Sequence, residues 1–239
     1  MKLIRLIAKH EWLGKTEAQR VIASGRVAVD GCLSKDAQRE VDRFMNVTLD
    51  QTIVQKADRS LYLMLHKPAG IVSATTDPEH TTVLDLIDDP DKATLHLAGR
   101  LDRFTTGLII MTNDGRWSKR LMAPEAQVPK VYLVDTAEPI PSEAVDAFAK
   151  GFYFHTENIT TAPARLEIIG ERRARLTLHE GRYHQVKRMF HRVRNRVLRL
   201  HREQIGGLRL PEDLAPGQWR ALTADEVRHA ICCPNLPPV

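Results

Sequence analysis

The sequence predicts an α+β fold in two domains, a small N-terminal domain at 1–56 and a larger one with a mainly antiparallel sheet at 57–231. Helical and strand periodicities alternate without the regular strand–helix–strand rhythm of a parallel sheet. Hairpin signals recur along the chain, and the polar stretch QKADRS at 55–60 is typical of a linker. Residues 232–239 are expected to form a loose tail.

The composition indicates a soluble globular protein. Of the 239 residues, 43% are hydrophobic and 27% are charged, which allows a sizeable core. No run of about 18 apolar residues is present, so we expect no membrane span, and the N-terminus lacks the features of a secretory signal. The cysteines, Cys32, Cys232 and Cys233, have no metal-ligand spacing and are expected to be free thiols in a reducing cytoplasm.

The charge distribution indicates a polyanionic partner. The net charge is +5, but residues 165–209 hold thirteen Lys or Arg against four Glu, so the rest of the chain is slightly negative. A basic block of this kind favours nucleic acid as the partner, while a merely solvated charged surface is the alternative.

The N-terminal domain is predicted to hold two helices followed by short strands. Apolar residues at 3–7 lie close to helical spacing, and a second helix opens at Thr16 and ends before Gly25. The segment RVAVDG alternates Val27 and Val29 inward and ends in an Asp-Gly turn, and 47–54 is further strand.

This N-terminal pattern resembles the S4 RNA-binding domain. The positions that match its usual motif are Lys2, Leu3, Arg5, Leu6, Ile7, Glu17, Ala18, Ile22, Gly25, Val27, Val29 and Gly31. Ile4 departs from the Asp usual there, and Gly14-Lys15 replaces Ser-Arg. The resemblance implies that Lys15, Arg20 and Arg26 bind RNA; a solvated amphipathic helix is the other interpretation.

The first half of the larger domain is predicted as strand, turn, strand over 61–76, with Pro68 and Gly70 in the turn. Residues 80–95 have a helical pattern. A strand at 108–112 follows, then an Asn-Asp-Gly turn and a helix that begins near Arg116.

The second half begins with a strand at 130–137 and a helix at 141–151, with Ser142 as N-cap and Gly151 as its end. A hairpin at 164–178 turns around Gly170-Glu171. A helix at 182–193 is expected to bury Val186, Met189, Phe190 and Val193 and to expose Lys187, Arg188, His191 and Arg192. Residues 196–201 form a further strand.

Asp102 stands between Arg100 and Arg103, just ahead of an apolar run. Neighbouring cations favour the charged form of a carboxyl group, and apolar walls keep that anion poorly hydrated and reactive. Glycosidic hydrolysis usually needs two carboxyl groups, and metal-dependent phosphodiester cleavage needs clustered acids; neither accompanies Asp102 in the sequence. A turn or cap aspartate that pairs with a neighbouring arginine is the simple alternative.

Four motifs in order resemble the pseudouridine synthases that act on ribosomal RNA. These are K-P-x-G at 67–70, G-R-L-D-x-x-T-x-G-L at 99–108, P-K-x-Y at 129–132 and E-G-R-x-H-Q-V-K-R-M-F at 180–190, followed by L-x-R-x-x-I-G-G-L at 200–208. Together with the S4-like part, the resemblance covers residues 1–231. It implies a catalytic domain with a central cleft.

The resemblance implies an isomerisation in which Asp102 is the nucleophile while the C1′–N1 bond of a flipped-out uridine breaks. The uracil rotates and is rejoined through C5, by attack at C1′ or through a glycal. Tyr132 would lie against the uracil and take the C5 proton, or be a core aromatic. Lys187 would pair with Asp102 and keep it ionised, or contact phosphate. No cofactor or metal is implied.

The remaining substrate-binding positions are carried over from the motifs. They are Arg100, Thr105, Arg182, His184, Gln185, Arg188, Ile205 and Leu208, with Ile205 and Leu208 as walls of the uracil pocket or plain core. Phe104 stands where the family commonly has Asp, and we expect this departure to change a contact next to the site and not the reaction.

The motif EGRYHQVKRMF most resembles synthases that modify 16S ribosomal RNA, at uridine 516. The expected partner is therefore 16S ribosomal RNA within a small-subunit assembly intermediate, and the composition favours a monomer. A synthase for 23S ribosomal RNA and a catalytically silent RNA-binding assembly factor are the alternatives.

Overall fold

The computed structural model describes residues 1–10 and 13–231, and the chain divides into two compact units, Met1–Ser60 and Leu61–Val239. The expected tail at 232–239, with Cys232 and Cys233, lies outside the described residues. No helix in the described ranges is long and apolar enough to cross a membrane.

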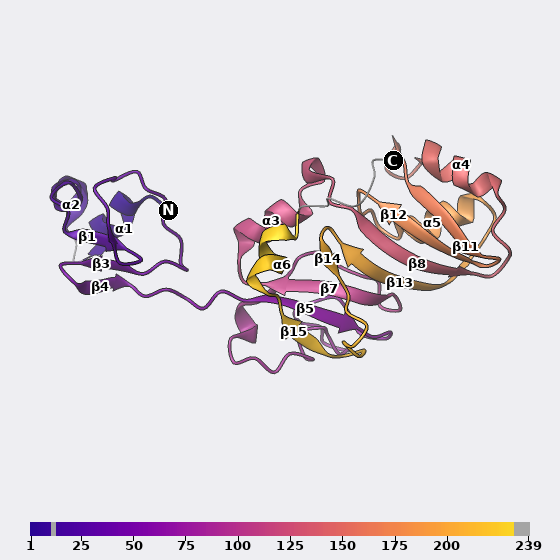
Figure 1. Ribbon diagram of the computed structural model, residues 1–239, viewed down its shortest axis with the longest axis horizontal. Coiled ribbons are helices and arrows are strands. Elements are labelled where there is room, and N and C mark those ends of the chain that lie inside the picture. Colours follow the sequence, from indigo (N-terminus) through magenta and orange to yellow (C-terminus); the bar gives the residue numbers. More distant parts are fainter. Residues whose placement is uncertain (11–12, 232–239) are drawn as a thin grey trace. The chain divides into compact units, whose positions relative to one another are not determined.

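The first unit packs two helices on a small antiparallel sheet (Figure 1). Its elements are α1 Leu3–Lys9, α2 Gly14–Ala23, β1 Val27–Val29, β2 Cys32–Leu33, β3 Val47–Leu49 and β4 Thr52–Gln55, with strand order β2-β1-β3-β4. Helix α2 begins two residues before the expected Thr16. The turn after β1 places Asp30 and Gly31 at φ 52° and 78°, the positive angles that a two-residue hairpin needs. Val27 and Val29 are fully buried, as their alternation predicts.

The second unit is built on one long sheet whose order is β11-β12-β8-β13-β7-β5-β15, with β6 beside β7 and β14 beside β13. Its strands are β5 Tyr62–Lys67, β6 His96–Leu97, β7 Thr106–Thr112, β8 Lys130–Thr136, β11 Arg165–Gly170, β12 Arg173–Leu178, β13 Val197–Ile205, β14 Leu208–Arg209 and β15 Trp219–Ala221. Its helices are α3 Gly115–Met122, α4 Glu143–Lys150, α5 Gln185–Arg192 and α6 Ala224–His229, with single turns η2 Lys92–Thr94 and η3 Pro124–Ala126. A separate short pair joins β9 Tyr153–Phe154 and β10 Ile159–Thr160.

The sheet is mainly antiparallel, as the sequence predicts, and β7 with β13 is its parallel pair in the described part. Strand β7 is buried on both faces because its run of Leu and Ile feeds two hydrophobic clusters. Ile109 and Met111 join the cluster that includes Phe148 of α4 and Phe190 of α5. Leu108 and Ile110 join the cluster that includes Trp117 and Leu121 of α3. The central position of β7 fixes the loop that precedes it.

Two predicted elements of this unit are wrong. Residues 71–76 do not form a strand, and only an isolated bridge joins Val72 to Thr82. Residues 80–95 form turns rather than a helix, with η2 as their only helical turn. The side chain of Asp85 accepts from the backbone N–H of Thr82, and that of Asp89 accepts from Asp91. Such local bonds compete with helix formation, and Pro90 disfavours helical backbone at the preceding residue.

Helix boundaries also differ in detail. Ser142 precedes α4, but its side chain makes no capping bond. Helix α5 begins at Gln185 instead of 182, because His184 adopts left-handed backbone with φ 47°. Val193, expected in the core, is half-buried at the end of this helix.

Candidate active site

The loop between Gly99 and β7 presents Asp102, and three buried side chains hold that loop. The ammonium group of Lys67 donates to the carbonyl oxygens of Pro68, Arg103 and Thr105, each at 2.9 Å. The Ser73 hydroxyl donates to the carbonyl of Leu101 at 2.7 Å and accepts from its N–H at 3.1 Å. The backbone on both sides of Asp102 is therefore fixed by the end of β5 and by the segment that follows it.

Arg202 ties the same loop to the sheet. Its Nε donates to the carbonyl of Leu108 at 2.8 Å, and its Nη1 donates to that of Arg100 at 3.3 Å. This contact depends on the close parallel approach of β13 to β7 at Gly107, where a Cβ would collide with the backbone of Arg202. Packing between β7 and β13 therefore requires a glycine at position 107.

The carboxylate of Asp102 contacts two cationic or titratable side chains from the 180–190 motif. Lys187 Nζ donates to Oδ2 at 2.7 Å, and His184 Nε2 lies 3.4 Å from Oδ1. Arg103 turns away and donates to the carbonyl of Gly70 at 3.1 Å. The Asp102 side chain is 29% exposed, so it is neither buried in the core nor free in bulk water.

A cavity of about 130 Å³ opens in front of this carboxylate, and we call it the Asp102 cavity. Eight of the predicted site residues line it: Arg100, Asp102, Thr105, Tyr132, Arg182, His184, Gln185 and Lys187. Tyr132, in β8, is 7% exposed. Asp102 is the one carboxylate among the described lining residues, which suits chemistry that needs a single acid side chain.

Three predicted substrate contacts are placed elsewhere. Ile205 and Leu208 pack in the cluster beneath α3, with Trp117 and Leu121, and do not line the Asp102 cavity. The alternative that they are plain core is the one the structure supports. Arg188 lies in a neighbouring groove and is held by a bidentate pair with Glu157 at 2.7 Å and by the ring of Phe154, 3.6 Å from the guanidinium carbon.

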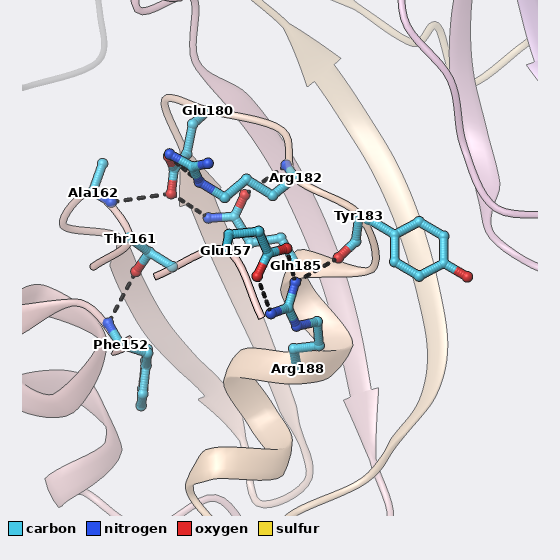
Figure 2. Close-up of polar contacts among 9 residues, drawn as sticks. All are labelled: Phe152, Glu157, Thr161, Ala162, Glu180, Arg182, Tyr183, Gln185 and Arg188. Atoms are coloured by element: carbon cyan, nitrogen blue, oxygen red, sulfur yellow. Dashed lines mark hydrogen bonds and ion pairs between the residues drawn. The ribbon is translucent and has the colours of Figure 1, made fainter. Parts of the chain in front are cut away.

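The turn before α5 is braced by a polar network (Figure 2). Glu180 Oε1 accepts from the amide of Gln185 at 2.7 Å and from the N–H of Ala162 at 3.0 Å, while the N–H of Arg182 donates to the Gln185 side chain at 2.9 Å. Because Gln185 is 3% exposed and uses both its polar atoms in this network, it positions the turn. Nearby, the hydrogen bond that the Glu157 carboxylate accepts from Arg188 lowers the pKa of Glu157.

Sequence reasoning missed three buried cations around the Asp102 cavity. In the sequence, these residues stand out only as members of the motifs K-P-x-G (Lys67), P-K-x-Y (Lys130) and L-x-R (Arg202). Burial lowers the pKa of Lys67 to about 8, against the raising effect of Asp102. Burial, then the charge of Arg202, lowers the pKa of Lys130 to about 8, and Glu180 opposes this. The signal for Lys67 and Lys130 was a lysine inside an otherwise apolar strand segment, since such a lysine has to be buried with its strand.

Two buried polar atoms beside the cavity have no hydrogen-bond partner among the described residues. They are Thr105 Oγ1 and Arg202 Nη2, and both residues line the Asp102 cavity. Buried polar groups are normally paired, so each has capacity for a polar group of a ligand or for water.

In the first unit, two of the three predicted RNA-binding residues lie next to a carboxylate, and the third lies among other cations. Arg26 forms a bidentate ion pair with Asp50, and Arg20 lies 3.6 Å from Glu17. Lys15 lines a hollow of about 570 Å³ with Lys2, Arg5 and Lys9, which are all exposed cations. The positive surface of this unit therefore centres on α1 and the start of α2.

Within the described ranges, no group of three His, Cys, Asp or Glu side chains lies close enough together to hold a metal ion. Cys32 is a free, exposed thiol.

Comparison with known proteins points to one family. The family model described as RNA pseudouridylate synthase matches residues 61–192. A ribosomal small subunit pseudouridine synthase A of Pseudomonas aeruginosa is 52% identical over 227 residues, 95% of this chain and 99% of the relative. The protein with the same name in Escherichia coli K12 is 44% identical over 231 residues, 97% of this chain and 100% of the relative.

A crystal structure of a pseudouridylate synthase, 35% identical, superposes with a TM-score of 0.70 and covers 96% of this chain and 99% of the other. The chain belongs to the RNA pseudouridylate synthase family.

Proposed function

We propose that this protein isomerises one uridine of 16S ribosomal RNA, uridine 516, to pseudouridine. The observation that carries the proposal is the pairing of Asp102 with Lys187 at 2.7 Å in a cavity walled by Tyr132. The relatives named above, whose names specify the ribosomal small subunit, supply the RNA class.

In the proposed reaction Asp102 is the nucleophile. Its carboxylate attacks C1′ as the C1′–N1 bond of the uridine breaks, and the bond between Asp102 and C1′ breaks in turn as the C1′–C5 bond forms. A proton leaves C5 while one is gained at N1, so substrate and product are isomers. A route through a glycal is the alternative. Lys187 orients the carboxylate through its charge-assisted hydrogen bond of 2.7 Å. Tyr132 lies against the base and accepts the C5 proton. A uracil anion leaves readily, so no second carboxylic acid is needed, in contrast to glycoside hydrolysis.

The base has to leave its stack to reach the cavity, which costs a few kcal/mol. The basic residues at 165–209 offset part of this cost by binding phosphates. Arg100 and Arg182 line the Asp102 cavity and are exposed, so they meet the strand beside the everted nucleotide. Arg188 supports the turn before α5, since Glu157 already occupies its donors.

The first unit, 1–60, is the S4-like RNA-binding part of the proposal. Lys15 is its strongest candidate contact, because it lines a hollow with three further cations. Arg20 and Arg26 contribute once their carboxylate neighbours are displaced or screened. The protein acts as a cytoplasmic monomer on an assembly intermediate of the small subunit, without a cofactor.

Mapping pseudouridines in 16S and 23S ribosomal RNA from cells with and without the protein tests reaction and target together. The proposal predicts loss of one pseudouridine, at position 516 of 16S RNA, and its return with the wild-type gene. Loss from 23S RNA instead would assign the protein to the other subunit. Unchanged maps would favour a silent assembly factor.

A further inference from the structure

Tyr183 is the most exposed large hydrophobic side chain in the described part of the chain. Its exposed fraction is 75%, compared with 7% for Tyr132 in the Asp102 cavity. Figure 2 shows its ring projecting away from the polar network that braces the turn before α5. Tyrosine is enriched at interfaces, because its ring is apolar and its hydroxyl can stay in water.

The ring is nevertheless held in place. The carbonyl oxygen of Tyr183 accepts from Arg188 Nη1 at 3.3 Å, and Glu157 fixes that guanidinium through two bonds of 2.7 Å. On the ring itself, His184 stacks with a centroid distance of 3.9 Å and an interplanar angle of 19°. One face of the tyrosine is therefore backed by a parallel imidazole, and the ring is positioned before any partner arrives.

Tyr183 and Asp102 both line an outer cleft of about 670 Å³. Three arginines line this cleft, Arg100, Arg103 and Arg182, and Asp102 is its one carboxylate among the described residues. The histidine behind Tyr183 is the residue whose Nε2 lies 3.4 Å from Asp102 Oδ1. The platform, the cations and the candidate nucleophile thus belong to one continuous surface.

We infer that Tyr183 is a stacking platform for an unpaired RNA base next to the target uridine. Single-stranded nucleic acid is bound by aromatic faces beside cationic grooves, and each stacked base contributes about 1–3 kcal/mol. The arginine-lined cleft favours this polyanion over an apolar protein surface. The inference rests on the proposed function, and it narrows the substrate to RNA in which a nucleotide flanking the target is unstacked from its own helix.

The binding test uses RNA hairpins that carry the target uridine, with the Asp102→Asn background to prevent turnover. Tyr183→Ser is expected to raise the Kd roughly 5- to 150-fold, while Tyr183→Phe stays within about twofold because it keeps the ring. Leu198→Ser is the control, since Leu198 in β13 is an apolar side chain with 57% exposure that lines neither cavity. Equal affinity for Tyr183→Ser and the parent would overturn the inference.

An abasic site in the RNA separates stacking from damage to the turn. Removing the base on the 5′ or the 3′ side of the target is expected to weaken parent binding as much as Tyr183→Ser does. Combining Tyr183→Ser with the abasic RNA should then reduce the affinity little more than either change alone. Additive losses at both flanking positions would show that Tyr183 does not stack on a neighbouring base.

Steady-state kinetics separate an effect of Tyr183 on RNA binding from an effect on the chemical step. In the background with Asp102 intact, Tyr183→Ser should raise KM and leave kcat within about twofold, because the platform binds RNA outside the reacting base. A fall in kcat at saturating RNA with unchanged KM would contradict the platform. A wild-type protein that binds the hairpin and forms no pseudouridine would refute the proposed function, while the coupling between Tyr183 and the flanking base would still be measured.

Discussion

Lys187 Nζ and Asp102 Oδ2 are 2.7 Å apart, although 85 residues separate them in the chain. The loop before β7 brings the carboxylate, and the first turn of α5 brings the ammonium group. Since Arg103 is bound to Gly70, Lys187 is the cation that directly contacts the catalytic candidate, with His184 on the other oxygen.

Lys187→Met is expected to lower kcat/KM at least tenfold, about 1.4 kcal/mol in the barrier, because Asp102 loses its charge-assisted hydrogen bond. Lys187→Arg should recover part of the rate, since it keeps the charge. Single-turnover pseudouridine formation measures both. Arg192→Met, at the exposed end of α5, is the matched control and should keep the wild-type rate at saturating RNA. Wild-type turnover by Lys187→Met would reassign the lysine to phosphate contact.

Thr105→Val is expected to lower the activity without lowering the free energy of unfolding. The Thr105 hydroxyl is buried and has no partner in the described structure, so its removal should leave stability unchanged or raise it by about 1 kcal/mol. Activity should fall about tenfold, or 1.4 kcal/mol, because that hydroxyl is proposed to contact the substrate.

The control is Thr112→Val in β7. Its hydroxyl donates to the carbonyl of Leu61 at 2.6 Å, so this variant should lose about 1–3 kcal/mol of stability and keep its activity. Thermal melts and single-turnover assays on both variants decide the matter. Full activity in Thr105→Val would show that the hydroxyl does not meet the RNA.

Stability should rise with pH between about 8 and 10.5, in contrast to most proteins. The folded-state pKa of Lys130 is about 8, below the ordinary 10.5, so in this window the unfolded chain binds more protons than the folded one. Below pH 8 Lys130 is protonated in both the folded and the unfolded state, and the free-energy cost of burying its charge is fully present. Lys67 titrates in the same range.

Urea unfolding at pH 8, 9 and 10 should show this rise of stability with pH, and Lys130→Met should retain about half of the slope. An identical slope in the variant would mean that Lys130 titrates normally.

Gly107→Ala is expected to destabilise the catalytic unit by more than about 2 kcal/mol. The residue has φ 109°, and a Cβ would meet the backbone of Arg202 where β13 pairs with β7. Gly217→Ala is the control, because it has a comparable φ of 86° with no atom within 4 Å of its Cβ. The control should lose only about 1 kcal/mol from backbone strain. Equal losses in the two variants, read by denaturant unfolding, would exclude the close strand approach as the cause.

Local sequence patterns predicted much of the fold because they act over short distances. The apolar run 108–111 predicted a buried strand, and Asp-Gly at 30–31 predicted a hairpin; both are present. The helix expected at 80–95 failed because aspartate side chains bond nearby backbone N–H groups there, an interaction that hydrophobic periodicity does not register.

The candidate site was predictable only where the family motifs name its residues. Asp102, Tyr132 and Lys187 do line one cavity. What Lys67 and Arg202 do could not be read from the sequence, because each acts on backbone carbonyls more than 30 residues away. Arg188 appeared free on its helix, since its partner Glu157 comes from a different segment. The motif left Ile205 either in the wall of the pocket or in the plain core, and its packing with Trp117 and Leu121 supports the core.

Single-turnover assays on Asp102→Asn, paired with RNA binding, address the nucleophile most directly. The amide keeps the shape of the carboxylate and removes its charge. Pseudouridine should not form, while affinity for the target RNA stays within a few fold of wild type. An asparagine variant that converts the uridine at the normal rate would eliminate position 102 as the attacking group, and with it the reaction assigned to this cavity.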